Sequence, residues 1–186
     1  NPAEKVIVPR VKESNTEEKA FMDEEQSTAF LNFIKSEPLF EKLYCITKLG
    51  LYYGFRRSEI LGLKWSAINW DKGEIVIDHT VVRGINGTEY RDNVKTPSSH
   101  RYMPLLKIVK DDLQNLMEKQ KELGIYSSDG YVFKWDDGRM YDPDYITKLF
   151  KKAVLRCDAV SDNLTFHGLR HSCCALLFEK GWDLGK

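Results

Sequence analysis

The chain has 186 residues, enough for one domain with a full hydrophobic core. Its 28 Lys and Arg balance 28 Asp and Glu, so affinity for nucleic acid cannot come from overall charge. It holds no uninterrupted apolar run long enough to span a membrane and no basic-then-apolar leader, which argues against a membrane or secreted protein. We expect a cytoplasmic protein with reduced cysteines.

Charge is unevenly distributed along the chain. Residues 1–37 carry five Lys or Arg against eight Asp or Glu. Residues 91–110 carry five basic side chains against the single acid Asp92; the basic ones are Arg91, Lys95, Arg101, Lys107 and Lys110. This local excess predicts one basic face or edge, and DNA binding that weakens as salt rises.

The first part of the chain predicts helices. Residues 1–19, with two prolines and mixed charges, are typical of an extended linker. Asp23 and Gln26 have the spacing of a capping box, which begins a helix that Pro38 ends. A second helix follows over residues 39–53, and Gly54 stands where a left-handed cap is expected.

The period of the apolar residues then changes from helical to alternating and back. A short helical turn is predicted from Ser58 to about Trp65. Strands are predicted over residues 74–79, 90–94 and 101–104, with reversals at 71–73 and 84–87, and further helices over 105–124, 142–157 and 165–181. The expected fold class is α+β, mainly helical with a small three-stranded antiparallel sheet.

The segment from Phe166 to His171 places two imidazoles and a guanidinium where the last helix is expected to begin. A helix N-terminus carries partial positive charge, so cations there call for an anion. His167 and Arg170, three residues apart, fall on one side of a helix and can hold a single phosphate. Two alternatives are an exposed turn without a ligand and a zinc pair of His167 with His171, although Gly168 replaces the glutamate of H-E-x-x-H.

Two further basic segments can serve the same chemistry. Arg56 is followed three residues later by Glu59, and a guanidinium held by a carboxylate is pre-organised for a phosphate; the alternative is an exposed ion pair of little consequence. Arg57, beside it, is assigned to packing or a backbone contact. Lys95 lies in a basic hairpin tip and can deliver an ammonium to a leaving oxygen or to a DNA backbone, unless the tip is an ordinary polar turn.

Taken in order, these segments resemble the catalytic domain of the tyrosine recombinases, the phage and conjugative-transposon integrases. The resemblance covers residues 19–186 and includes the linker-like N-terminal residues. Its motifs are YGFRRSEILGLKW (residues 53–65), KTPSSHRYMPL (95–105) and TFHGLRHS (165–172). The resemblance implies a catalytic domain over residues 20–186 and, in residues 1–19, a linker from a separate core-binding domain.

The resemblance also implies DNA strand exchange by transesterification through a 3′-phosphotyrosine, with neither metal nor cofactor. Arg56 and Arg170 would clamp the scissile phosphate and Glu59 would orient the first arginine. His167 would assist proton movement at the nucleophile, and Lys95 would protonate the departing 5′ oxygen. Double-stranded DNA with attachment sites is the implied partner, and the complete protein is expected to form a tetramer on it.

The nucleophilic tyrosine of such proteins lies downstream of the H-x-x-R helix. All nine tyrosines of this chain precede His167, the last being Tyr145. We therefore expect this stretch of chain, taken alone, to be a monomer that binds phosphate but does not cleave DNA. A non-enzymatic DNA-binding module and a type IB topoisomerase are the other functions that these motifs allow.

Overall fold

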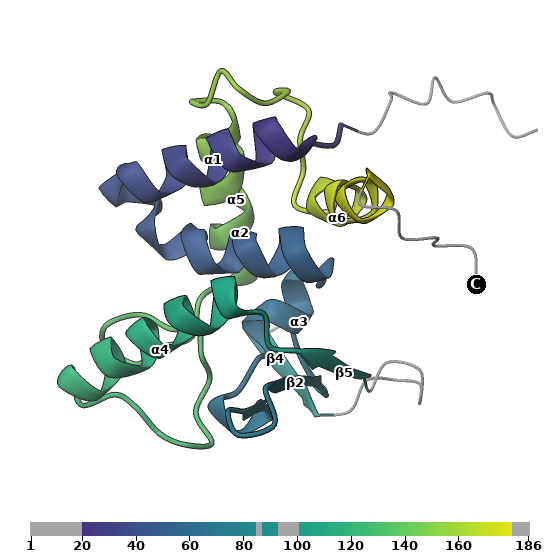
Figure 1. The fold of residues 1–186 in the computed structure, drawn as a ribbon. Coiled ribbons are helices and arrows are strands. Elements are labelled where there is room, and N and C mark those ends of the chain that lie inside the picture. Colours follow the sequence, from purple (N-terminus) through teal and green to yellow (C-terminus); the bar gives the residue numbers. More distant parts are fainter. Residues whose placement is uncertain (1–19, 85–86, 93–100, 180–186) are drawn as a thin grey trace, which may run out of the picture.

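The computed structural model describes residues 20–84, 87–92 and 101–179. Its helices form a layer of α1 (Glu24–Ser36), α2 (Glu41–Tyr53), α5 (Pro143–Val154) and α6 (Gly168–Glu179). Below this layer lie α4 (Lys107–Glu122) and the strands, with the short helix α3 (Arg57–Leu61) between the two parts (Figure 1). None of the helices in the described ranges is long and apolar enough to cross a bilayer.

Local sequence signals account for the helix ends. Asp23 and Gln26 form the predicted capping box of α1, and Asp142 caps α5 ahead of Pro143. Gly54 ends α2 with φ 62°, a left-handed conformation that glycine adopts without steric cost. The turn Pro38–Phe40 precedes α2 as a 3-10 helix. The predicted end of the last helix at Gly181 lies outside the described residues.

The predicted three-stranded antiparallel sheet is confirmed, but one of its strands differs. It consists of β1 (Ile68–Asn69), β2 (Glu74–Ile77) and β5 (Arg101–Pro104), in the order β1-β2-β5. Ile77 pairs with Arg101 and Ile75 with Met103.

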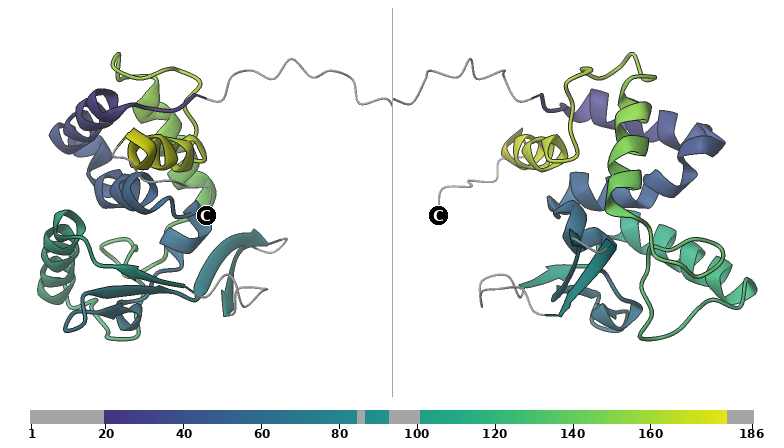
Figure 2. Two further views of the ribbon diagram at one scale, coloured as in Figure 1. Left: turned by 45° about the vertical axis from the view of Figure 1, so that its right-hand side comes forward. Right: turned by 180° about the vertical axis from the view of Figure 1, so that it is seen from behind.

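The prediction that residues 90–94 belong to this sheet is wrong for residues 90–92, and residues 93–94 lie outside the described residues. Residues 90–92 belong to a separate hairpin of β3 (His79–Gly84) and β4 (Gly87–Asp92), which extends to one side of the molecule (Figure 2). The chain leaves the first sheet after Ile77 because β3 packs closely on α3. A Cβ on Gly62, which follows α3, would lie 2.8 Å from the carbonyl oxygen of His79, and Val81 is buried.

An aromatic chain fixes α5 against both α1 and the segment before α6. Phe30 meets Phe150 edge to face at 5.7 Å between ring centroids, and Phe150 lies 5.2 Å from Phe166. α6 also packs closely on α2, since a Cβ on Gly50 would lie 2.8 Å from Cδ1 of Leu169. These contacts place the start of α6 beside the end of α2, where the two predicted arginine segments can meet.

Candidate active site

Arg56 occupies the position immediately before α3, and a buried carboxylate holds it there. Its backbone N–H donates to Oε2 of Glu59 at 2.8 Å, and its Nη1 donates to Oε1 at 2.8 Å. The Glu59 side chain is 1% exposed, whereas 57% of the Arg56 side chain remains open to solvent. Glu59 therefore fixes both the backbone N–H and one guanidinium nitrogen of Arg56, while much of the Arg56 side chain stays accessible.

The same carboxylate binds a second guanidinium that sequence reasoning did not assign to the site. Arg101 donates from Nη2 to Oε2 of Glu59 at 2.8 Å and from Nη1 to Oε1 at 3.3 Å, and it stacks over Phe55 at 5.4 Å. Burial acts to raise the pKa of Glu59, but the hydrogen bonds from Arg101 and Arg56 outweigh it and hold that pKa below its ordinary value. Glu59 is therefore ionised at neutral pH.

The third predicted residue, His167, differs slightly from its expected position. It was placed in the first turn of the last helix, but α6 begins one residue later, at Gly168. The His167 carbonyl accepts from the backbone N–H of Arg170 at 3.1 Å, and the Thr165 hydroxyl accepts from that of Gly168 at 3.1 Å. Thr165 and His167 thus accept hydrogen bonds from backbone N–H groups of the first turn of α6, and the Phe166 side chain between them is buried. The exposed His167 side chain therefore stands at the N-terminus of α6.

Arg170 joins the two arginine segments. It lies in the first turn of α6, half-buried, and its Nη1 donates to the backbone carbonyl of Gly54. Gly54 is two residues before Arg56, so this bond ties the H-x-x-R segment to the turn that carries the first arginine. The two guanidinium groups are remote in sequence and close in the fold.

A groove of about 620 Å³ brings these residues together. Arg56, His167 and Arg170 all line it. The rest of its wall comes from α3, β3, α5 and the segment before α6: Arg57, Ser58, Val81, Val82, Thr147, Thr165 and Phe166. No carboxylate belongs to the described residues of this lining, so the groove has the charge and donors that an anion requires.

The other basic residues of the three segments have different places. Lys95 lies outside the described residues. Arg57 donates to the carbonyl of Pro143 at 3.0 Å and to the hydroxyl of Thr147, a backbone and packing contact of the kind expected for it. Arg101 points toward Glu59, so the basic stretch predicted over residues 91–110 does not present all its charges on one outer face.

The zinc alternative has little support. The rings of His167 and His171 meet edge to face at 5.0 Å between centroids. Among the described residues, however, no group of three or more His, Cys, Asp or Glu side chains is placed to hold a metal ion.

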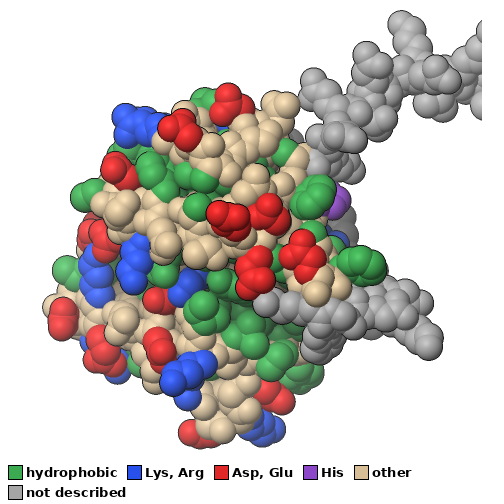
Figure 3. All heavy atoms as spheres, turned by 45° about the horizontal axis from the view of Figure 1, so that its top comes forward, with side chains coloured by type: hydrophobic (Ala, Val, Ile, Leu, Met, Phe, Trp, Pro, Cys, Tyr) green, Lys and Arg blue, Asp and Glu red, His purple; other side chains and the backbone are tan. Residues whose placement is uncertain are grey.

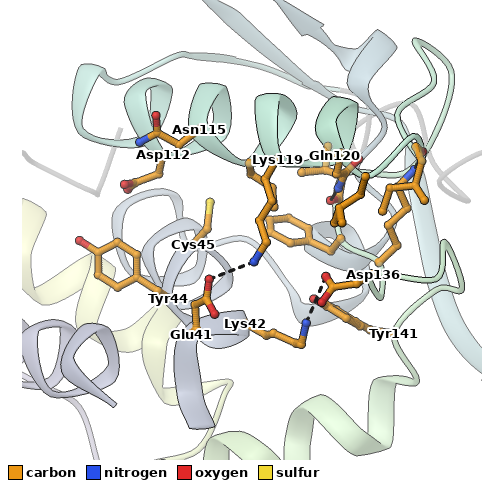
Figure 4. Close-up of a pocket in the computed structure, with 16 residues that line it drawn as sticks. Glu41, Lys42, Tyr44, Cys45, Asp112, Asn115, Lys119, Gln120, Asp136 and Tyr141 are labelled. Carbon is orange, nitrogen blue, oxygen red and sulfur yellow. Dashed lines mark hydrogen bonds and ion pairs between the residues drawn. The ribbon is translucent and has the colours of Figure 1, made fainter. Parts of the chain in front are cut away.

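A second hollow, of about 220 Å³, lies between α2, α4 and the segment that follows α4 (Figure 4). Its lysines are already bonded: Lys42 to Asp136 at 3.6 Å and Lys119 to Glu41 at 3.2 Å, while Lys134 donates to a backbone carbonyl. Because carboxylates compensate Lys42 and Lys119, and acidic side chains also line this hollow, it is a poorer anion site than the groove at Arg56. The face drawn in Figure 3 likewise mixes acidic and basic side chains and forms no continuous basic surface.

Comparison with known proteins identifies the family of this chain. The sequence profile described as "Phage integrase family" matches residues 20–186. A "Tyrosine recombinase XerC-like" protein of Caldanaerobacter subterraneus is 28% identical over 198 residues, covering 97% of this chain and 49% of the relative. The transposase from transposon Tn916 of Enterococcus faecalis is 26% identical over 180 residues, covering 93% of this chain and 44% of that protein.

Among solved structures, the Tn1549 transposon integrase in complex with transposon right end DNA has a similar fold. Its TM-score is 0.80 at 24% sequence identity, and the match covers 93% of this chain and 57% of that one. The present chain thus spans about half the length of the curated relatives it matches.

Proposed function

Because this chain belongs to the phage integrase family of tyrosine recombinases, we propose that it is the catalytic part of a protein that carries out site-specific recombination of double-stranded DNA. The observation that supports this most is the convergence of Arg56, His167 and Arg170 on one groove that no described carboxylate lines. Arg57, which also lines the groove, is bonded to Pro143 and Thr147, so the guanidiniums of Arg56 and Arg170 with the imidazole of His167 suit a single phosphodiester.

In the proposed reaction a tyrosine oxygen attacks the scissile phosphorus. The bond from phosphorus to the tyrosine forms as the bond to the 5′ oxygen breaks, which leaves a 3′-phosphotyrosine and a 5′ hydroxyl. Arg56 and Arg170 bind the non-bridging oxygens, whose negative charge they offset in the transition state. His167 moves the proton at the tyrosine, and Lys95 supplies the proton to the 5′ oxygen.

We place the tyrosine nucleophile outside the described residues. No described residue that lines the groove is a tyrosine. Tyr53, which lies near Arg56 in sequence, donates to the Pro104 carbonyl at 2.9 Å and accepts from the Leu106 N–H at 2.8 Å, so its hydroxyl joins α2 to the start of α4. We therefore propose that this stretch alone binds DNA without cleaving it. We also propose that it is a monomer by itself and that the complete protein assembles as a tetramer on its attachment sites.

The test is covalent attachment to DNA in the complete recombinase. R56A and R170A should each abolish the covalent protein–DNA product, because each removes a positive charge that stabilises the negatively charged transition state. R139A is the matched control: Arg139 is an exposed arginine paired with Asp137 and lies outside the groove lining. Attachment at the wild-type level by either groove variant, with an unchanged circular dichroism spectrum, would rule out the assignment.

The role of Lys95 has its own test. K95A should slow cleavage of ordinary DNA and recover when sulfur replaces the bridging 5′ oxygen, because a thiolate leaves without needing a proton. R56A should gain nothing from the same substrate. Recovery of both variants to the same degree would remove Lys95 from the role of acid.

A further inference from the structure

The carboxylate of Glu59 is shared by two cations of unequal exposure. Arg56 and Arg101 each bond to it, yet 57% of the Arg56 side chain is exposed and only 29% of the Arg101 side chain. The cluster of one acid and two bases carries one excess positive charge. The guanidinium that carries this excess toward solvent is Arg56, which lines the groove.

A pair of Arg56 with Glu59 alone would behave differently. Such a pair is electrically neutral, and the buried carboxylate would repel a phosphate that approached the arginine. Arg101 supplies the charge that offsets Glu59, so the same carboxylate can orient Arg56 without cancelling its attraction for an anion.

We propose that Arg101 is a positioning residue: by neutralising Glu59, it leaves the charge of Arg56 available to a phosphate in the groove. This role rests on the proposed function, because it assumes that the anion at Arg56 is a phosphodiester. Arg101 itself is absent from the described lining of the groove, so it acts on the phosphate through Glu59.

The fold explains why a strand residue can do this. Side chains of β5 alternate between its two faces, so Arg101 and Met103 are partly buried while Tyr102 is 64% exposed. Pairing of Arg101 with Ile77 of β2 fixes its backbone, and the Phe55 ring supports its guanidinium. The cation is therefore held at the carboxylate from two sides.

The experiment measures binding of inorganic phosphate to this chain by NMR, following the side-chain Nε–Hε resonance of Arg56. R101Q should weaken phosphate binding about fivefold, because one charge near the site is lost. The double variant E59Q/R101Q should recover to within about twofold of wild type, since it removes the acid together with its counterion. E59Q alone should bind phosphate more tightly than wild type.

The double variant separates action through Glu59 from a direct or purely structural role of Arg101. If R101Q and E59Q/R101Q bind phosphate equally weakly, or if R101Q binds like wild type, the role assigned to Arg101 is wrong. R101K, which keeps the charge but loses the two-pronged contact, should lose less affinity than R101Q. Should R101Q fail to fold, E59Q still decides: unchanged or weaker binding overturns the role.

Failure of the proposed function gives another result. If phosphate leaves the Arg56 resonance of the wild-type chain unmoved, then the groove is no phosphate site and both proposals fall. If wild type binds and the variants do not follow the predicted order, only the role of Arg101 falls.

Discussion

Of the three arginines that line the groove, the two assigned to the phosphate, Arg56 and Arg170, are held in place in different ways. Arg56 is held by an ionised carboxylate, Glu59, that a second arginine shares. Arg170 is held by a neutral backbone carbonyl, that of Gly54. A carboxylate orients strongly and also compensates charge, whereas a carbonyl orients more weakly and leaves the charge whole. The Arg56 side therefore depends on an ion cluster, and the Arg170 side on backbone geometry and helix packing.

The largest expected difference between the two sides is in stability. E59A should lower the free energy of unfolding by about 3 kcal/mol, because it leaves the partly buried Arg101 without its carboxylate. R170M should cost about 1 kcal/mol, the value of one hydrogen bond. Urea unfolding followed by circular dichroism measures both, and equal losses would contradict the distinction.

A substitution at Gly54 should affect phosphate binding in addition to stability, because the Gly54 carbonyl holds Arg170. Gly54 and Gly124 have similar φ values, 62° and 68°, so G54A and G124A should each cost about 1 kcal/mol of stability. A Cβ at Gly54 would lie 3.6 Å from Sγ of Cys173, an ordinary contact, and nothing lies within 4 Å of one at Gly124. Backbone adjustment that relieves the strained φ in G54A would move the carbonyl that Arg170 binds, whereas Gly124 has no such partner among the described groove residues, so only G54A should weaken phosphate binding in the NMR titration. Equal phosphate binding by the two variants would argue against this coupling.

Acid should weaken the Glu59 side and leave the Arg170 side unaffected. The folded-state pKa of Glu59 lies below its ordinary value of 4.5. Its stabilising contribution is therefore complete above that value and is lost as pH falls through the lower folded-state pKa. The stability difference between wild type and E59Q should shrink below pH 4.5, while that between wild type and R170M should stay constant, because a carbonyl does not titrate. Urea titrations across the acid range measure both, and a constant difference for E59Q would count against an ionised cluster.

The smallest expected effect concerns thiols beside Arg170. Burial, followed by the neighbouring Cys174, raises the pKa of Cys173 to about 11, and Cys174 is exposed on the same helix. Iodoacetamide at pH 8 should alkylate Cys174 first and Cys173 far more slowly, as mass spectrometry of the peptides would show. The variant C174S gives the rate at which Cys173 is alkylated without the neighbouring thiol. Equal rates would mean that α6 packs on Gly54 less closely than the structure shows.

Local signals in the sequence predicted much of this fold. The capping box at Asp23, the left-handed Gly54 and the Asp142–Pro143 start of α5 depend on neighbouring residues, so they can be read from short segments. The strand 79–84 was missed because its packing on Gly62 depends on a contact between distant segments. The same dependence explains why residues 90–92, which pair with this strand, were assigned to the wrong sheet.

The site could be predicted only in part. Spacing and resemblance pointed to Arg56, Glu59, His167 and Arg170, and the fold brings the three basic residues to one groove. Arg101 was not assigned to the site, because its contact with Glu59 joins β5 to α3 across 42 residues. No spacing pattern in the sequence indicates such a contact. The alternating pattern of β5 could have indicated it, because a basic residue on the inner face of a strand requires a nearby buried acid.

The most direct test of the central claim is a structure of this chain bound to double-stranded DNA. We expect one backbone phosphate within hydrogen-bonding distance of both Arg56 and Arg170, with His167 beside it. Contact of the two guanidiniums with different phosphates, or DNA bound on a face away from the groove, would contradict it.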